Sequence, residues 1–185
     1  MALLRDQGDK ALLTRYSSFM TVENTLSQVV ELLLKNDRLK RLLYYTDPKA
    51  LHLPKLTPAQ SLSLVNDQIR IIPKLGTEVD VKPHIVLTFD KFIPTDDMTA
   101  FRSCVLGVDI TVPYDYWNLE NFKLRPYAIA GEVDAMLNKS NQTRLGIADF
   151  AGARMLIVNS EVGGLSLSYT IETFTDDIKL HPEER

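Results

Sequence analysis

The stretch 101–113, FRSCVLGVDITVP, constrains the fold most, because apolar and polar residues alternate along it. One side of the alternation consists of Cys104, Leu106, Val108, Ile110 and Val112. The other side consists of Ser103, Gly107, Asp109 and Thr111. Successive side chains of a strand point to opposite faces of a sheet, so this period of two predicts a long strand with one buried face.

Similar signals predict a sheet of several strands. The predicted strands cover residues 69–75, 84–93, 101–113, 145–158 and 164–174. The last of them alternates large apolar residues with serine and threonine. The pairs Ala151-Gly152 and Gly163-Gly164 are expected at bulges or turns, where glycine is favoured.

Apolar residues at helical spacing predict helices at 21–34, after a cap at Thr21, and at 126–138, with Pro126 as its first residue. A shorter helical piece carries Leu39, Leu42 and Leu43. In 126–138 the expected buried stripe is Ile129, Ala130, Val133, Met136 and Leu137, whereas Glu132, Asp134 and Lys139 are expected to face water. The order of elements predicts an α+β fold: a mostly antiparallel sheet with two main helices on one face.

The chain is expected to form one domain, 21–175, between an N-terminal arm, 1–20, and a polar C-terminal tail, 176–185. Within the domain, 46–68 reads as a long loop excursion because Pro48, Pro54 and Pro58 interrupt any regular element. A short helix is expected to start at Thr57-Pro58.

Composition excludes several classes of function. With 21 basic and 24 acidic side chains the net charge is -3, which argues against a protein that grips nucleic acid through its phosphates. One cysteine excludes an internal disulfide and favours a reducing compartment. Arg5, Asp6 and Asp9 interrupt the apolar start, so neither a signal peptide nor a membrane segment is expected.

No motif indicates catalysis, so we expect no enzyme activity, no cofactor and no metal site. His52, His84 and His181 are scattered and lack a metal-ligand spacing. Cys104 falls on an apolar strand face and is expected in the core. The pairs Asp96-Asp97 and Asp176-Asp177 are expected to be solvated. An enzyme that uses scattered carboxylates is the alternative.

Two clusters are candidates for contacts. The basic cluster Lys35, Arg38, Lys40 and Arg41 reads as a solvated helix face, with an acidic partner or passing DNA as the alternative. The aromatic group Tyr114, Tyr116, Trp117 and Phe122 reads equally as a local core contact or a subunit contact, since interfaces concentrate aromatic residues.

The pattern resembles neck proteins of tailed bacteriophages, in particular the tail-terminator type, over residues 20–174. The resemblance lies in the leading helix, the YYTDP loop, the IRIIPKL strand, YDYWNLENFKLRPYAIAGEVDAMLN and GIADFAGARMLIVNSEVGGLSLSYTIE. It implies a structural virion protein, without catalytic residues, in a homo-oligomeric ring that is commonly a hexamer.

Such a ring caps the tail tube protein, joins it to the head connector or stopper protein, and lets DNA pass through its lumen without specific binding. The implied location is the virion neck, with assembly in the host cytoplasm. A head-completion or stopper protein of the same neck is the nearest alternative. The expected subunit-interface residues are Tyr114, Tyr116, Trp117, Phe122, Tyr44 and Tyr45.

Overall fold

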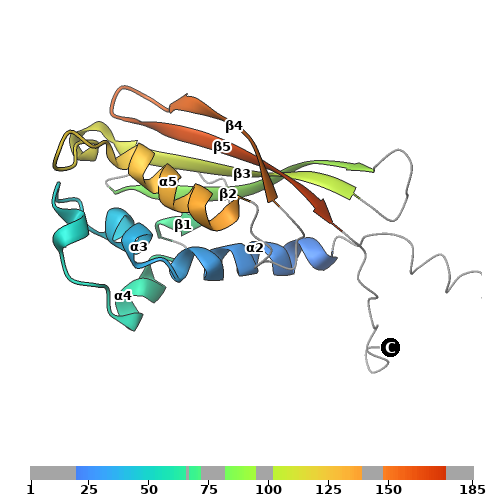
Figure 1. The fold of residues 1–185 in the computed structure, drawn as a ribbon, viewed down its shortest axis with the longest axis horizontal. Helices are drawn as coiled ribbons and strands as arrows, with labels where there is room; N and C mark the ends of the chain where they lie inside the picture. Colours follow the sequence, from blue (N-terminus) through green and yellow to red (C-terminus); the bar gives the residue numbers. More distant parts are fainter. Residues whose placement is uncertain (1–19, 66, 72–81, 95–101, 139–147, 174–185) are drawn as a thin grey trace, which may run out of the picture.

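The computed structural model describes residues 20–65, 67–71, 82–94, 102–138 and 148–173. It has five strands and several helices, with the helices gathered on one face of the sheet (Figure 1). The predicted α+β class is confirmed. Residues 1–19 of the predicted arm, residues 174–175 of the predicted domain and the predicted tail lie outside the described residues, whereas Met20, assigned to the arm, begins α2.

The sheet has the strand order β1-β2-β3-β5-β4. Its strands are β1 (Ile69–Arg70), β2 (His84–Pro94), β3 (Arg102–Pro113), β4 (Ala148–Ile157) and β5 (Val162–Thr173). All neighbouring strands are antiparallel except β1, which has two residues and runs parallel to β2. Of the strand expected at 69–75, the structure describes only the first part as a strand, and 72–75 lie outside the described residues.

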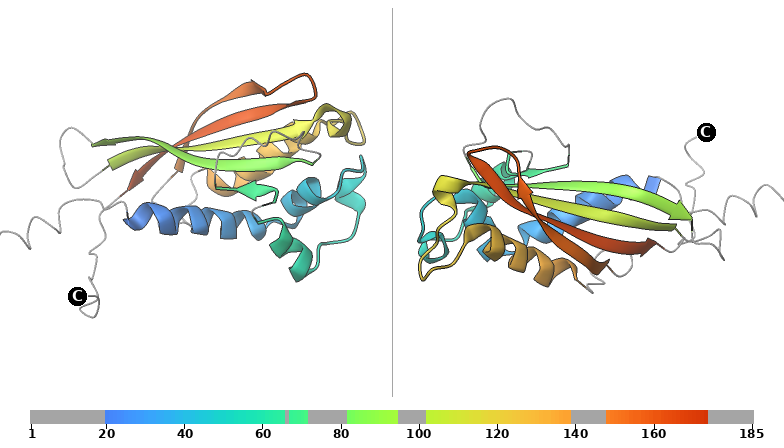
Figure 2. Two further views of the ribbon diagram at one scale, coloured as in Figure 1. Left: turned by 180° about the vertical axis from the view of Figure 1, so that it is seen from behind. Right: turned by 90° about the horizontal axis from the view of Figure 1, so that it is seen from above.

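The alternation that predicted β3 is confirmed by its pairing. Leu106 lies opposite Tyr169 and Val108 lies opposite Leu167, and Leu87 of β2 lies opposite Val108 on the other side. These side chains are almost inaccessible to solvent and form the helix-side face. Burial of each large apolar side chain contributes on the order of 1.5–3 kcal/mol. The opposite face has no helix over it in the described part of the chain (Figure 2).

Four α-helices are described: α2 (Met20–Leu34), α3 (Asp37–Tyr44), α4 (Pro58–Ser63) and α5 (Arg125–Leu137), with two short 3-10 helices, η1 (Ala50–His52) and η2 (Tyr114–Tyr116). The cap predicted at Thr21 is wrong, because α2 already includes Met20. Pro126 lies in the first turn of α5 but follows Arg125, so it is not the first helical residue.

The excursion 46–68 is more structured than a loop. It contains η1 and α4, and α4 begins, as predicted, at Thr57-Pro58. Thr57 and Gln60 form a reciprocal cap there, with the Gln60 amide donating to Thr57 Oγ1 at 3.3 Å and the Thr57 amide donating to Gln60 Oε1 at 2.9 Å. Such a cap satisfies two backbone donors that a helix start otherwise leaves open.

The two glycine pairs differ in role. A register shift between Phe150 and Gly152 confirms the bulge expected at Ala151-Gly152. The turn or bulge expected at Gly163-Gly164 is wrong, because both residues lie in regular pairing inside β5. Gly163 is required for a close approach instead, since a Cβ there would lie 2.5 Å from the Tyr114 hydroxyl oxygen.

Candidate subunit interface

Arg125 joins three parts of the chain at one buried point. Its side chain is fully buried, and all its bonds go to backbone carbonyls. Nε donates to Tyr116 at 2.8 Å, Nη1 donates to Leu42 at 2.9 Å and Tyr45 at 2.6 Å, and Nη2 donates to Thr46 at 3.0 Å and Asp47 at 2.7 Å. Leu42 lies in the last turn of α3, where a helix leaves carbonyls without partners, and Tyr45, Thr46 and Asp47 are the cap and the two residues after it.

The Arg125 guanidinium remains charged at neutral pH in spite of its burial. Burial lowers its pKa to about 10, and the nearby Asp47 carboxylate opposes that change. A cation is costly to bury unless its donors are bonded, and here the five carbonyl oxygens supply that bonding. We call Arg125 with these carbonyls the Arg125 junction. It fixes residues 42–47 against the end of η2.

Further contacts bind the same two segments to each other. The Glu120 amide donates to the Pro48 carbonyl at 3.3 Å. The Glu120 carboxylate lies 3.6 Å from Lys49 Nζ and 3.3 Å from His52 Nε2. The first half of the excursion and the segment 114–124 therefore form one surface at one end of the molecule, at the left in Figure 1.

Four of the six predicted interface aromatics are partly buried and pack against the core at this end of the molecule. Tyr44 and Tyr45 are partly buried against the core, and their rings meet edge to face with centroids 5.1 Å apart. Tyr44 accepts a bond from Gln60 at 3.2 Å, and Tyr45 donates to the Pro54 carbonyl at 3.2 Å. Tyr116 and Trp117 also pack on the core. Tyr44 and Tyr45 thus hold the excursion in place.

Two of the six, Tyr114 and Phe122, present large apolar surface to solvent. Tyr114 is 37% exposed and Phe122 is completely exposed. The Tyr114 ring lies 5.1 Å from the Trp117 ring, and Trp117 Nε1 donates to the Val112 carbonyl at 2.9 Å. Tyr114 is therefore held by an anchored neighbour, and Phe122 projects from the turn that follows.

Phe122 sits in a backbone conformation that aromatic residues rarely adopt. Asn121 and Phe122 have φ values of 59° and 58°. The Lys123 amide donates to the Glu120 carbonyl at 3.4 Å, as in a type I′ turn. Glycine is favoured at the position of Phe122 in such a turn, and the left-handed conformation costs other residues roughly 1–2 kcal/mol. The turn thus holds an aromatic ring in solvent at a cost in stability.

Phe122→Gly is expected not to lower the free energy of unfolding of the isolated protein, and to raise it by up to about 1 kcal/mol. The substitution relieves the left-handed strain and removes no buried contact, because the ring is fully exposed. Chemical denaturation measures the effect. The matched control is Leu62→Gly, at a 70% exposed position in α4, where glycine should cost about 1 kcal/mol. Equal losses in the two variants would contradict the strained turn.

The strand β4 adds exposed apolar residues that the sequence patterns did not single out. Met155 is 50% exposed and Ile157 is 73% exposed. Both lie opposite helix-side positions of β5, at Leu165 and Gly163. They are nevertheless open to solvent, because β4 is an edge strand in the described sheet. Position on the edge, which no local pattern reveals, explains this exposure.

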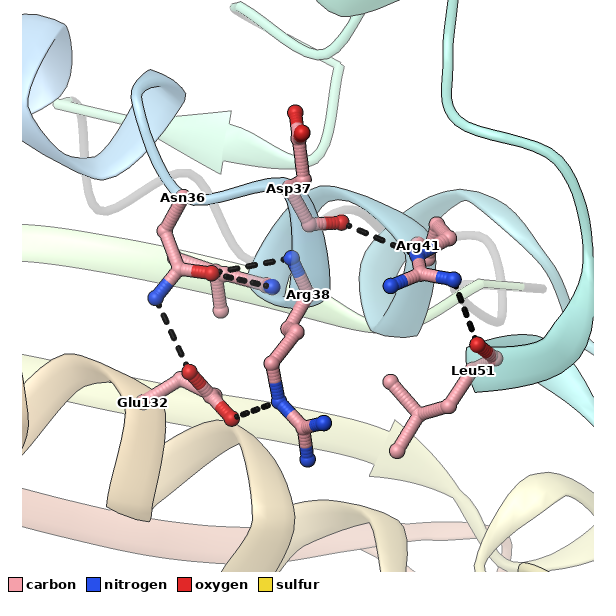
Figure 3. Close-up of polar contacts among 7 residues, drawn as sticks. Asn36, Asp37, Arg38, Arg41, Leu51 and Glu132 are labelled. Carbon is pink, nitrogen blue, oxygen red and sulfur yellow. Dashed lines mark hydrogen bonds and ion pairs between the residues drawn. The ribbon is translucent and has the colours of Figure 1, made fainter.

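The basic cluster is only partly a solvated helix face (Figure 3): Lys35 and Arg38 are exposed as predicted, whereas the prediction is wrong for the partly buried Lys40 and Arg41. Arg38 Nε pairs with Glu132 at 2.6 Å, and Arg41 donates to the Asp37, Leu51 and Leu53 carbonyls. Lys40 pairs with Asp37 at 2.8 Å. Hydrogen bonds from Lys40 and then from Lys55 lower the pKa of Asp37 to about 2. The cluster attaches α3 to α5 and to the excursion.

Two expectations about α5, that Glu132 and Asp134 face water, are corrected by hydrogen bonds. Glu132 accepts bonds from Arg38 and from Asn36 Nδ2, the latter at 2.9 Å, so it does not face water. Burial alone would raise the pKa of Glu132, but these bonds outweigh it and leave the pKa lowered. Asp134 accepts a bond from the Tyr169 hydroxyl at 3.1 Å. Lys139 lies outside the described residues.

The two described side chains that were weighed as catalytic or metal-binding groups, Cys104 and His84, are both buried. Cys104 is buried, and burial raises the pKa of its thiol to about 11, as suits a core residue. His84 is buried beside Arg70, with 2.8 Å between the two nitrogens. Among the described residues no three His, Cys, Asp or Glu side chains are placed to hold a metal. His181 and the pairs Asp96-Asp97 and Asp176-Asp177 lie outside those residues.

None of the described helices is long and apolar enough to cross a membrane.

Comparison with known proteins places the chain in a family. No curated protein matches the chain. The family model YomW matches residues 36–171, from the cap of α3 to Ile171 in β5. The family name comes from a Bacillus phage region, which indicates a phage-encoded protein. The chain belongs to the YomW family.

Proposed function

We propose that this protein is a structural subunit of a tailed-phage neck: a tail terminator that forms a ring, caps the tail tube and joins it to the head connector. It works there without catalytic turnover, and DNA passes through the ring without specific binding. The assignment to the phage neck rests on the resemblance of residues 20–174 to tail terminators, and membership of a phage family agrees with it.

The observation that carries the assembly role is the exposed apolar surface at one end of the molecule. Phe122 and Tyr114 belong to the segment 114–124, to which Arg125 bonds at Tyr116, and the Tyr114 hydroxyl lies over Gly163, the residue opposite Ile157. Phe122 is held in solvent by a strained turn, and such strain is retained where a function requires the conformation. A ring repeats one heterologous contact until the rotation closes, so a surface of this kind is needed on each copy.

Imaging of virions from the phage that encodes the chain tests the proposal. We expect a closed ring of this protein between tail tube and head, with each subunit burying well over ~800 Å² against its neighbours. A ring one position nearer the capsid would assign the head-completion role instead. Virions whose neck contains no copy, or one isolated copy, would refute the proposal.

A further inference from the structure

The strand β4 leaves part of a sheet edge open. It lies at one end of the strand order of the described sheet (Figure 1). Its first residues are covered at the edge, because Asn138 forms a bridge with Ala148 and its Oδ1 accepts a bond from the Phe150 amide at 3.4 Å. A bulge follows between Phe150 and Gly152. From Ala153 onward, no described residue outside β5 pairs with the strand.

The hydrogen bonds at the end of β4 show which of its backbone groups point away from the sheet. The Val158 amide donates to the Val162 carbonyl at 3.1 Å, so the backbone groups of Val158 point toward β5. The N–H and C=O of one strand residue point to the same side, and successive residues alternate in direction. Ala153, Met155 and Ile157 therefore direct their donors and acceptors to the open edge.

The side chains of this open part do not discourage pairing with another strand. Residues 153–157 read ARMLI, with Arg154 as the one charge and no proline. Met155 is 50% exposed and Ile157 is 73% exposed. Proteins protect an exposed edge with lysine, proline, a bulge or a covering segment, and an apolar edge without them pairs with another strand. The bulge and the bridge protect only the first part of β4.

The open part of the edge is complementary to itself. It is bounded by the bulge on one side and by the turn between β4 and β5 on the other, so its centre is Met155. Two copies that pair antiparallel about this centre place Met155 opposite the same residue of the other copy, and Ala153 opposite Ile157. The outward backbone groups of both copies then meet, and a small side chain faces a large one. Arg154 lies opposite Leu156, so no charge is directly opposite a like charge.

We propose that two copies of this chain pair edge to edge through residues 153–157 of β4, antiparallel about Met155, and form one continuous sheet. The contact does not rest on the proposed function. A two-fold contact uses the same surface on both copies and closes at two, so it is separate from the contact that repeats around a ring. A standard interface involves roughly 20–30 residues a side, so this shorter contact gives a weak dimer whose fraction rises with protein concentration.

A charge exchange at the centre of the contact tests the pairing. Met155→Lys places two lysines directly opposite each other across the two-fold axis, and Met155→Glu does the same with two carboxylates. Sedimentation velocity over a range of protein concentrations measures the association constant. We expect the parent to dimerise and each variant to associate at least about tenfold more weakly, because like charges directly opposite each other oppose strand pairing. An equal mixture of the two variants should recover a dimer, with one chain of each kind by native mass spectrometry.

The matched control makes the same exchange at Leu62, which is 70% exposed but lies on α4. Leu62→Lys and Leu62→Glu should dimerise like the parent. A second pair of variants tests the backbone bonds. Ala153→Pro removes an outward N–H at an edge position that tolerates proline, and should weaken association at least about tenfold. Ala153→Ser keeps this N–H and should dimerise like the parent, and circular dichroism checks that each variant retains the fold.

Four results would overturn the inference. These are a parent that stays monomeric at every concentration, equal weakening in the Leu62 variants, a dimer that persists in Met155→Lys, and equal dimerisation of Ala153→Pro and Ala153→Ser. A mixture of Met155→Lys and Met155→Glu that stays monomeric would refute pairing about Met155. Because all these measurements concern the free protein, each such result leaves the proposed neck ring standing.

Discussion

Arg125→Met is expected to lower the free energy of unfolding by roughly 3–5 kcal/mol. Methionine keeps most of the buried volume but donates no hydrogen bond. Five backbone carbonyls then lose their partner, and that of Leu42 is fully buried. An unsatisfied buried acceptor costs about 1–3 kcal/mol before relaxation. Urea denaturation followed by circular dichroism measures the loss.

Two variants sharpen this result. Arg125→Lys retains the charge but offers three donors from one point, so it should recover only part of the lost stability. Arg154→Met replaces an exposed arginine of β4 and should change the free energy of unfolding by less than about 0.5 kcal/mol. If Arg125→Met were as stable as Arg154→Met, the Arg125 junction would not organise this end of the molecule.

Local periodicity was sufficient to predict most of the fold. The alternation of apolar and polar residues predicted both β3 and β5 and the apolar face of each, because successive side chains of a strand point to opposite faces. The helical spacing of Ile129, Val133 and Leu137 likewise predicted the buried side of α5, and all three are buried. The helix α5 buries one face, which is the situation that such patterns report, whereas β5 is buried at every position from Val162 to Leu167, which its alternation did not predict.

Contacts between distant residues could not be predicted in this way. Glu132 is polar and was expected in water, yet its partners Asn36 and Arg38 lie 96 and 94 residues away in the sequence. Arg125 gave no signal at all, because its five acceptors are backbone carbonyls, which every residue possesses. A buried arginine at a helix start looks, in sequence, like an ordinary surface cation.

The exposure of the candidate interface residues could not be predicted for a related reason. Aromatic residues serve equally in a core and at a surface, and the tertiary position decides between the two. Tyr44 and Tyr45 are partly buried because the excursion folds back over them, whereas Phe122 is exposed because a turn reverses the chain beneath it. Met155 and Ile157 show the converse, since they are apolar residues left open at a sheet edge.

Leu137→Asp is expected to be about as damaging as the loss of the Arg125 side chain, with a decrease of roughly 4 kcal/mol or more in the free energy of unfolding. Leu137 is 2% exposed and belongs to the core between α5 and the sheet. The substitution removes a buried apolar side chain and places a carboxylate there without a hydrogen-bond or ion-pair partner. Thermal and urea unfolding measure the loss, and Leu137→Ala, at about 2–4 kcal/mol, provides a milder variant that still folds.

The matched control for Leu137→Asp is Ala135→Asp, two residues earlier on the exposed side of the same helix. Both variants add one carboxylate near the C-terminus of α5, so both incur the same unfavourable helix propensity and interaction with the helix dipole, together about 1 kcal/mol. Any further loss in Leu137→Asp measures the cost of burial alone. Equal melting temperatures of the two variants would mean that α5 does not pack on the sheet through Ile129, Val133 and Leu137.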